Sequence, residues 1–199
     1  MPSPQNIIIV PGLGDHKTLT AWATKRWPNY GLEPIIHCVG WYDSKITFLE
    51  KLQNLTNKID ELISQEKKVS LIGCSAGASA VMNAFIERKN VIHRAISICG
   101  RLKEGTGGGF RSLKSRSVSS PLFAESVRLF ENRENLLSES DRKKIMTVRA
   151  MFGDELVPAN TSILDGAQNI KIPIFEHSLS IYTSLWIFSK PLVNFLTKD

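Results

Sequence analysis

The chain has 199 residues, 42% of them hydrophobic, which is enough for one well-buried domain and few for two. We therefore expect a single domain over residues 1–199. No stretch approaches the roughly 20 consecutive apolar residues of a membrane-spanning helix, and the first residues lack the pattern of a secretory signal. On these grounds we expect a cytoplasmic protein without a transmembrane segment.

The formal net charge of +6 comes mostly from one segment. Residues 101–149 contain 11 Lys and Arg against 6 Asp and Glu, mixed with Gly and Ser. Nucleic-acid sites present a broader basic face with interleaved aromatic side chains, so we expect no nucleic-acid partner. We interpret the excess as a solvated loop, with weak contact of residues 101–116 with an anionic surface as the alternative.

The three cysteines, Cys38, Cys74 and Cys99, are odd in number and form no C-x-x-C pair. This pattern argues against a disulfide framework and against a zinc site, so we expect no metal. All three are predicted to be small buried side chains in a reducing compartment.

Short apolar runs bounded by Gly or Pro predict six strands. Most of these runs are continuous and rich in β-branched residues, as is typical of strands buried on both faces of a parallel sheet. The predicted strands cover residues 6–10, 34–39, 69–73, 94–100, 147–153 and 170–176.

Apolar residues at helical spacing fill the intervals between these runs. In residues 45–65 they recur every three or four positions, which predicts an amphipathic helix with Lys51 on its outer face. The alternation of strands and helices predicts an α/β fold with a doubly wound, mostly parallel six-stranded sheet and helices on both faces. The other expected helices are 17–27, 76–88 and 181–197, the last kinked or interrupted by Pro191.

Residues 101–146 interrupt the alternation and are predicted to be an insertion. Their first part is a basic segment rich in Gly and Ser, which is typical of a long mobile loop. Ser120 and Pro121 suit a helix N-cap and first turn, and the apolar spacing that follows predicts a helix over 121–137. Such an insertion could act as a cap or lid over a binding site.

The segment Gly73-Cys74-Ser75-Ala76-Gly77 leaves the third predicted strand and opens a predicted helix. It matches G-x-S-x-G, in which small flanking residues permit a sharp strand-to-helix turn that exposes the serine hydroxyl. Ser75 is therefore the candidate nucleophile, with a plain helix N-cap as the alternative. A serine hydroxyl is a weak nucleophile, so this hypothesis also requires a base, an acid and an oxyanion hole.

The base should follow a strand, because the carboxyl ends of parallel strands meet at the edge where Ser75 lies. His177 follows the last predicted strand and is the preferred base, whereas His16, after the first strand, is its rival. His37 is expected inside a strand as a core residue, and His93 at the opposite edge of the sheet.

The acid and the oxyanion hole are expected at the same edge. Asp154 follows the fifth predicted strand and is the preferred acid, with Glu155 as a substitute and a turn or cap role as the alternative. The small-residue loop after the first strand can point backbone N–H groups at a substrate oxygen. We therefore expect the oxyanion hole to consist of the N–H groups of Leu13 and Ala76.

Nucleotide-binding motifs fail in the loop after the first strand. Pro11 and His16 stand where a phosphate-binding loop requires glycine, and Lys17 replaces the third glycine of the dinucleotide pattern. We therefore expect no nucleotide cofactor.

The order of these motifs resembles that of the α/β-hydrolase superfamily, and the chain is similar to a minimal small serine hydrolase. The elbow GCSAG, the acid in GDELVP and the histidine in EHS follow one another along the chain. The resemblance implies that Ser75 attacks an acyl carbonyl, His177 transfers the proton and Asp154 orients the imidazole, without a metal or an organic cofactor.

The chain departs from this family's pattern at four positions. Pro11 stands where many members carry His, and Cys74 stands where His is frequent. Gly153 directly precedes the acid, and Glu176 precedes the histidine where glycine is usual. The catalytic roles are compatible with all four differences.

The expected function is that of a serine hydrolase that cleaves a small carboxylic ester or thioester through an acyl-enzyme, with an amide left open. The alternatives are a noncatalytic binding module of this fold for an anionic partner and an acyltransferase with the same triad. Trp41 and Tyr42 are expected near the active edge, either as an aromatic wall or as loop packing. The oligomeric state is left open.

Overall fold

The computed structural model describes residues 4–43, 45–105 and 120–198. Its strands form one parallel sheet in the order β2-β1-β3-β4-β5-β6, which confirms the predicted six-stranded sheet. In the register of β1, Ile8 lies between Ile35 of β2 and Leu71 of β3. The strands are β1 (Gln5–Val10), β2 (Leu32–Ile36), β3 (Val69–Cys74), β4 (Ala95–Ile98), β5 (Ile145–Ala150) and β6 (Gln168–Ile172).

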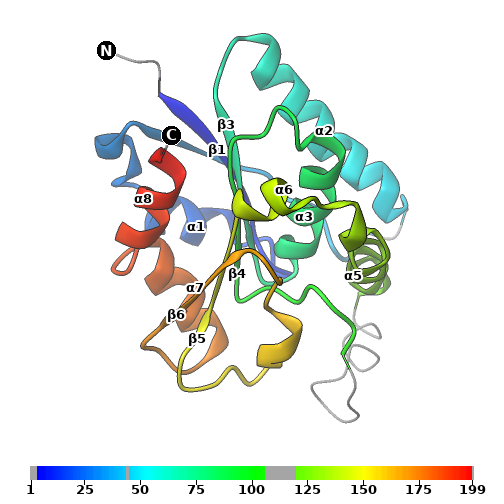
Figure 1. Cartoon of the computed structure of the whole chain (residues 1–199), viewed down its shortest axis with the longest axis vertical. Helices are drawn as coiled ribbons and strands as arrows, with labels where there is room; N and C mark the ends of the chain where they lie inside the picture. The colour runs from blue at the N-terminus through cyan, green and yellow to red at the C-terminus, as the bar shows by residue number, and fades with distance from the viewer. Residues whose placement is uncertain (1–3, 44, 106–119, 199) are drawn as a thin grey trace.

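Helices cover both faces of this sheet, as predicted (Figure 1). One face carries α1 (Lys17–Ala23), α7 (His177–Leu185) and α8 (Lys190–Thr197). The other carries α2 (Phe48–Ser64), α3 (Gly77–Arg88) and α5 (Pro121–Arg133), and the short α6 (Glu139–Lys143) leads into β5. None of the described helices combines the length and the apolar character that crossing a bilayer requires.

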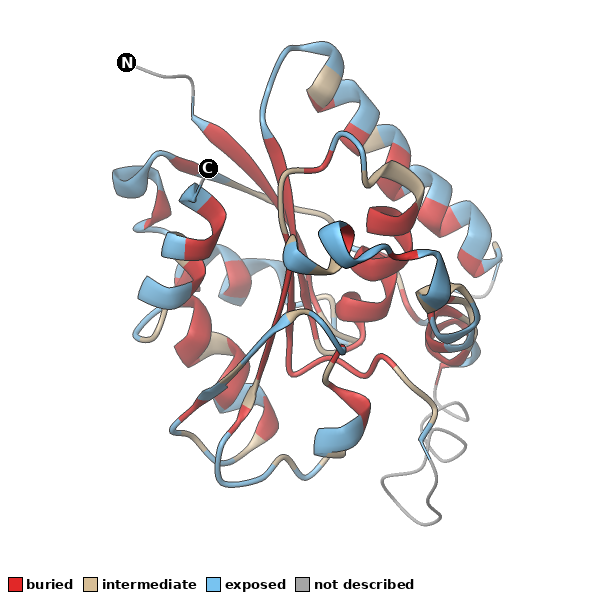
Figure 2. Ribbon diagram, viewed as in Figure 1, coloured by how far each residue is buried: buried red, intermediate tan, exposed pale blue. Residues whose placement is uncertain are grey.

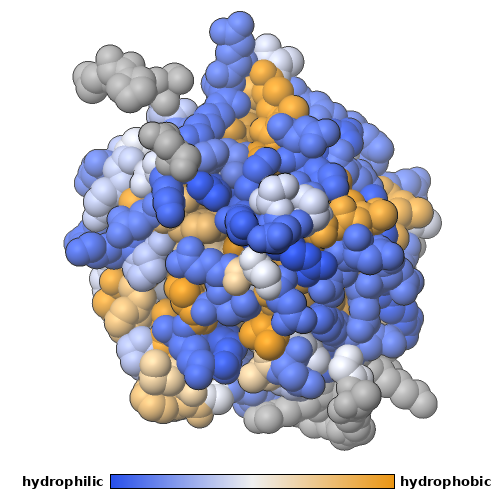
Figure 3. Space-filling view, viewed as in Figure 1, coloured by the Kyte–Doolittle hydropathy of each residue, from blue (hydrophilic) through white to orange (hydrophobic). Residues whose placement is uncertain are grey.

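The alternation of side chains along β1 explains the two cores of the molecule. Ile8 and Val10 pack in the core beneath α2, α3 and α5, whereas Ile7 and Ile9 pack in the core beneath α1, α7 and α8. All four side chains are fully buried, which is why this strand is a continuous apolar run. Figure 2 shows the buried sheet between helices with buried inner and exposed outer sides, and Figure 3 shows a largely hydrophilic surface with a few apolar areas.

Two of the predicted helices differ from their expected bounds. Pro191 interrupts the predicted helix 181–197 because it lies in the first turn of α8, where a missing N–H is tolerated. The predicted helix 17–27 is shorter than expected: α1 ends at Ala23, and a separate 3-10 helix, Trp27–Tyr30, follows with Pro28 in its first turn.

The prediction that Lys51 faces solvent is wrong. Its side chain is buried, and Nζ donates to the carbonyl oxygens of Val39 at 3.1 Å and Gly40 at 2.9 Å. The long flexible stem carries the ammonium from α2 to this loop, a reach that helical periodicity does not reveal. Asp15 holds the same loop, since its carboxylate accepts the N–H groups of Val39 at 3.1 Å and Gly40 at 2.7 Å.

The helix predicted within the insertion is present as α5. It begins at Pro121 behind the predicted N-cap Ser120, whose Oγ accepts the N–H of Phe123 at 3.3 Å. The helix ends at Arg133, before the predicted position 137, and a 3-10 helix, Glu134–Leu136, follows. α5 packs against α3 in the helical layer, and most of the predicted mobile loop (106–119) lies outside the described residues.

Candidate active site

Ser75 lies in the turn between β3 and α3, at the carboxyl edge of the sheet. Its φ of +52° is a left-handed conformation that residues other than glycine rarely adopt. The neighbouring glycines make the turn possible, because a Cβ on Gly77 would clash with the carbonyl oxygens of Val10 and Pro11, and one on Gly73 would clash with the backbone of α3. The sharp strand-to-helix turn predicted from G-x-S-x-G is therefore present.

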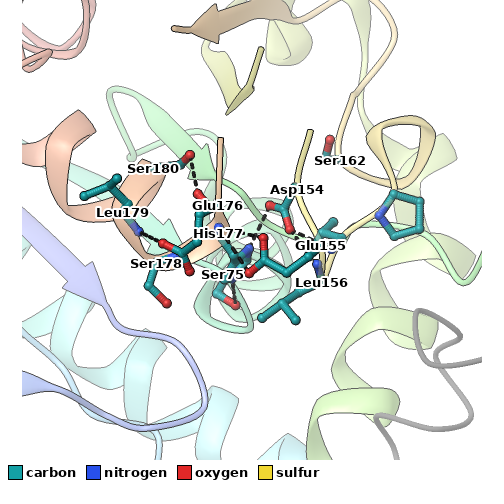
Figure 4. Close-up of polar contacts among 12 residues, drawn as sticks. Ser75, Asp154, Glu155, Leu156, Ser162, Glu176, His177, Ser178, Leu179 and Ser180 are labelled. Carbon is teal, nitrogen blue, oxygen red and sulfur yellow. Dashed lines mark hydrogen bonds and ion pairs between the residues drawn. The ribbon is translucent and has the colours of Figure 1, made fainter. Parts of the chain in front are cut away.

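The turn after β3, the loop after β5 and the start of α7 bring Ser75, Asp154 and His177 together (Figure 4). Ser75 Oγ and His177 Nε2 are 2.7 Å apart. On the other side of the ring, His177 Nδ1 is 2.7 Å from Asp154 Oδ2. These distances join a hydroxyl, a buried imidazole and a carboxylate in one continuous chain of hydrogen bonds.

The carboxylate of Asp154 is held by backbone groups as well as by the imidazole. Its Oδ1 accepts the N–H of Leu156 at 2.8 Å and that of Val157 at 2.9 Å. Burial by itself raises the pKa of Asp154, but the hydrogen bond and charge of His177 and these N–H groups outweigh it, so the pKa lies below its ordinary value. Asp154 is therefore ionised at neutral pH and can stabilise a protonated imidazole.

Two glutamates position the backbone around His177. The carboxylate of Glu155 accepts the backbone N–H of His177 at 3.0 and 3.3 Å. It therefore contacts the backbone of the histidine, whereas a substitute for the acid would contact the imidazole ring. Glu176 has a φ of +79° and caps α7 by accepting the N–H groups of Ser178 at 3.0 Å and Leu179 at 2.5 Å. Neither role followed from the sequence, because both depend on where the loop after β5 meets the start of α7.

The N–H groups of Leu13 and Ala76 lie in the surroundings of Ser75. Both residues line a cavity of about 40 Å³ that also reaches Ser75. Within the described part of the chain, neither N–H group has a hydrogen-bond acceptor, so both are free to bind an oxygen of a ligand. A larger, open cavity of about 340 Å³ also reaches Ser75, has His177 in its wall and is bordered by α1 and α7.

The other histidines lie outside this chain of hydrogen bonds. His16 lines the larger cavity, but its ring makes no hydrogen bond to Ser75 or to a carboxylate among the described residues. The prediction that His37 is a core residue inside a strand is wrong, because it is only partly buried and lies one residue beyond the end of β2. Burial is the main cause that lowers its pKa. His93 precedes β4, at the opposite edge of the sheet as predicted.

The prediction of three buried cysteines is wrong for Cys38, which is exposed. The predicted strand was too long, because β2 ends at Ile36 and Cys38 belongs to the loop that follows. Cys74 and Cys99 are buried, and burial raises the pKa of Cys74 to about 12, so the neighbour of Ser75 stays a protonated thiol. No group of three or more His, Cys, Asp or Glu among the described residues could hold a metal ion.

The two aromatic residues expected near the active edge have different environments. Trp41 is buried, and its ring centroid is 6.2 Å from that of Phe48 and 6.2 Å from that of Phe123, which corresponds to the predicted loop packing. Tyr42 is exposed. Neither ring lines the two cavities that reach Ser75.

Comparison with known proteins finds similarity in structure alone. No protein-family model matches the chain, and no curated protein sequence matches it. The chain is similar to Est1E from Butyrivibrio proteoclasticus, with 16% identity and a TM-score of 0.66 over 98% of this chain and 88% of that one. It is also similar to a structure described for LipS and LipT, two metagenome-derived lipolytic enzymes, with 12% identity and a TM-score of 0.67 over 100% and 99% of the two chains. A third structure, a soluble variant of monoglyceride lipase from Saccharomyces cerevisiae, gives 9% identity and a TM-score of 0.66 over 100% and 89%.

Proposed function

The chain has the α/β-hydrolase fold, and within this fold we propose that it is a serine hydrolase that cleaves a carboxylic ester or thioester of a small molecule. The observation that carries this proposal is the chain of hydrogen bonds from Ser75 through His177 to Asp154. Two of the similar structures are described as lipolytic enzymes or as a monoglyceride lipase, which favours an ester over an amide.

In the proposed reaction, Ser75 Oγ attacks the acyl carbonyl while His177 Nε2 accepts its proton. The ionised Asp154 stabilises the imidazolium that forms and keeps Nδ1 protonated, so that Nε2 is the basic nitrogen. The N–H groups of Leu13 and Ala76 bind the oxygen on which negative charge develops. His177 then gives the proton to the leaving alcohol or thiol, and water releases the acid by the same steps.

The position of His177 indicates where each half of the substrate lies. Because the imidazole protonates the leaving group, that group occupies the cavity of about 340 Å³ that has His177 in its wall. The acyl group then enters the cavity of about 40 Å³, whose walls include Leu13, Ala76 and Phe123. This division favours a short acyl group on a larger alcohol or thiol.

A fluorophosphonate probe tests the proposal directly, because it labels serines that a neighbouring base activates. We expect covalent labelling of the wild-type protein and of the surface control Ser64→Ala, and no labelling of Ser75→Ala. An unlabelled wild-type protein that is folded by circular dichroism would contradict the proposal and favour a noncatalytic binding module.

A series of p-nitrophenyl esters that differ in acyl length tests the substrate assignment. We expect acetate or propionate to be cleaved faster than octanoate, and Phe123→Ala to shift the preference toward longer chains by enlarging the smaller cavity. Product analysis in the presence of added alcohol distinguishes a hydrolase from an acyltransferase. A hydrolase releases mainly the free acid, whereas an acyltransferase forms mainly the new ester.

A further inference from the structure

Exposed apolar and aromatic side chains gather on the outer side of α1 and α7 and on the turn into α8. Trp22 and Trp186 are 43% and 38% exposed, and their ring centroids lie 4.8 Å apart. Figure 3 shows apolar atoms at the left margin of the molecule, over the turn between α7 and α8. We define the α1–α7 face as Leu19, Trp22, Tyr30, Leu179, Trp186 and Ile187, all of them exposed.

The α1–α7 face is continuous with the larger cavity at Ser75. Leu19 lines that cavity, and Trp22 follows on the same side of α1 because it is three positions further along the helix. Trp22 contacts Trp186, which in turn lines a second, open pocket of about 560 Å³ together with Tyr30 and Ile187. An apolar strip therefore runs from the mouth of the proposed substrate cavity to this second pocket.

Positive charges predominate on the segments that form this strip. Residues 16–32 and 177–198 contain no Asp or Glu, although both segments carry Lys or Arg. None of these cations forms an ion pair with a described residue, and Lys25 Nζ lies 5.5 Å above the ring of Trp22. The flanking Glu176 is engaged in capping α7. The exposed cations are Lys17, Lys25, Arg26, Lys190 and Lys198.

This combination matches one kind of partner. Tryptophan and tyrosine have an apolar body and a polar edge, and beside Lys and Arg they are typical of the membrane–water interface. Positive charge without compensating carboxylates attracts anionic phospholipid head groups. A second copy of this chain would bring cations against cations, so the charge pattern disfavours self-association through the same face.

We propose that the α1–α7 face docks the protein on the surface of an anionic phospholipid membrane. Lipid binding itself does not depend on the proposed hydrolase activity. Its consequence for the substrate does rest on that activity: a docked molecule places the cavity mouth at Leu19 against the bilayer, from which an apolar ester can enter without crossing water.

Vesicle co-sedimentation of the full chain tests this proposal. The Ser75→Ala variant is used so that no lipid is cleaved, with vesicles of equimolar phosphatidylcholine and phosphatidylserine or of phosphatidylcholine alone. We expect binding to the anionic vesicles that weakens with added salt, and much weaker binding to the neutral ones. Because Trp27 and Trp41 are buried, lipids with brominated acyl chains should quench mainly the emission of Trp22 and Trp186.

Two surface variants locate the docking face. Lys25→Gln/Arg26→Gln/Lys190→Gln should lower the partition coefficient roughly 100-fold, at about fivefold for each cation removed. Trp22→Ala/Trp186→Ala should lower it by roughly tenfold or more.

A matched control removes the same charge elsewhere. Lys45→Gln/Lys67→Gln/Lys143→Gln changes three exposed lysines outside the α1–α7 face and should leave binding within about twofold.

Three results would overturn the proposal: no binding of the folded protein to anionic vesicles, an equal loss of binding in the control triple variant, or a dimer in solution that Trp22→Ala/Trp186→Ala dissociates. Labelling by the fluorophosphonate probe is measured separately, so failure to bind lipid and failure of the hydrolase proposal are distinguishable.

Discussion

Replacing Lys51 by methionine should destabilise the protein, because the ammonium of Lys51 is the donor to two loop carbonyls. The side chain is 5% exposed, and methionine keeps most of its volume, so the change removes the charge without a large cavity. The carbonyl oxygens of Val39 and Gly40 lose their donor, at a cost of about 1–3 kcal/mol each. Part of this cost is offset, because a buried ammonium no longer has to be desolvated. We expect a net loss of about 2–3 kcal/mol, which is a fall in Tm of about 4–12 °C for a chain of this size.

Thermal unfolding followed by circular dichroism measures this effect. The matched control is Lys58→Met on the same helix, where the lysine forms a surface ion pair with Glu61 at 2.8 Å and should contribute at most about 0.5 kcal/mol. Equal Tm values for Lys51→Met and Lys58→Met would refute the reasoning that the buried ammonium holds the loop at 39–40.

Three further predictions concern the candidate active site. Glu155→Ala should lower kcat about five- to tenfold with little change in KM or Tm, because the N–H of His177 loses its acceptor, and Glu155→Gln should restore part of the rate in steady-state assays with a soluble ester. Ser75→Gly should raise the free energy of unfolding by about 0.5–1 kcal/mol in a urea titration, because glycine adopts the φ of +52° without strain, whereas Ser75→Ala should show no such gain. The pKa of Asp154 is lowered in the folded protein, so its ionised carboxylate stabilises the folded state at pH values above the unfolded pKa of about 3.9. This stabilisation is lost as the pH falls through the pKa of the folded state. The Tm difference between wild type and Asp154→Asn should accordingly be largest near neutral pH and shrink below about pH 4, and a difference that grows toward acid pH would contradict the direction of the shift.

The local features of the fold were predictable because each follows from a short stretch of sequence. As a strand, a run such as NIIIV at 6–10 can bury every side chain and pair its backbone N–H and C=O groups only between two neighbouring strands. It therefore indicated a strand inside a parallel sheet. The element boundaries were less accurate at 34–39, where β2 ends at Ile36, because β2 is an edge strand and nothing in the local pattern marks where pairing stops.

The candidate site was predictable to a similar degree. Ser75, Asp154 and His177 each follow a predicted strand, and the carboxyl ends of parallel strands share one edge, so their proximity followed from the order of the elements. The roles of Glu155 and Glu176 did not follow, since a carboxylate beside a histidine in sequence or in a neighbouring loop can face the ring, the backbone or solvent.

Local sequence patterns are enough to define the parallel sheet, the sharp turn at Ser75 and the edge at which the polar residues meet, because apolar periodicity and small residues act over a few positions. The burial of Lys51, the contact of Glu155 with the backbone of His177 and the contact of Trp22 with Trp186 all depend on the packing of the folded chain. Each of these contacts joins segments that the chain path brings together from a distance, and their free energy depends on distances and burial that no local pattern encodes.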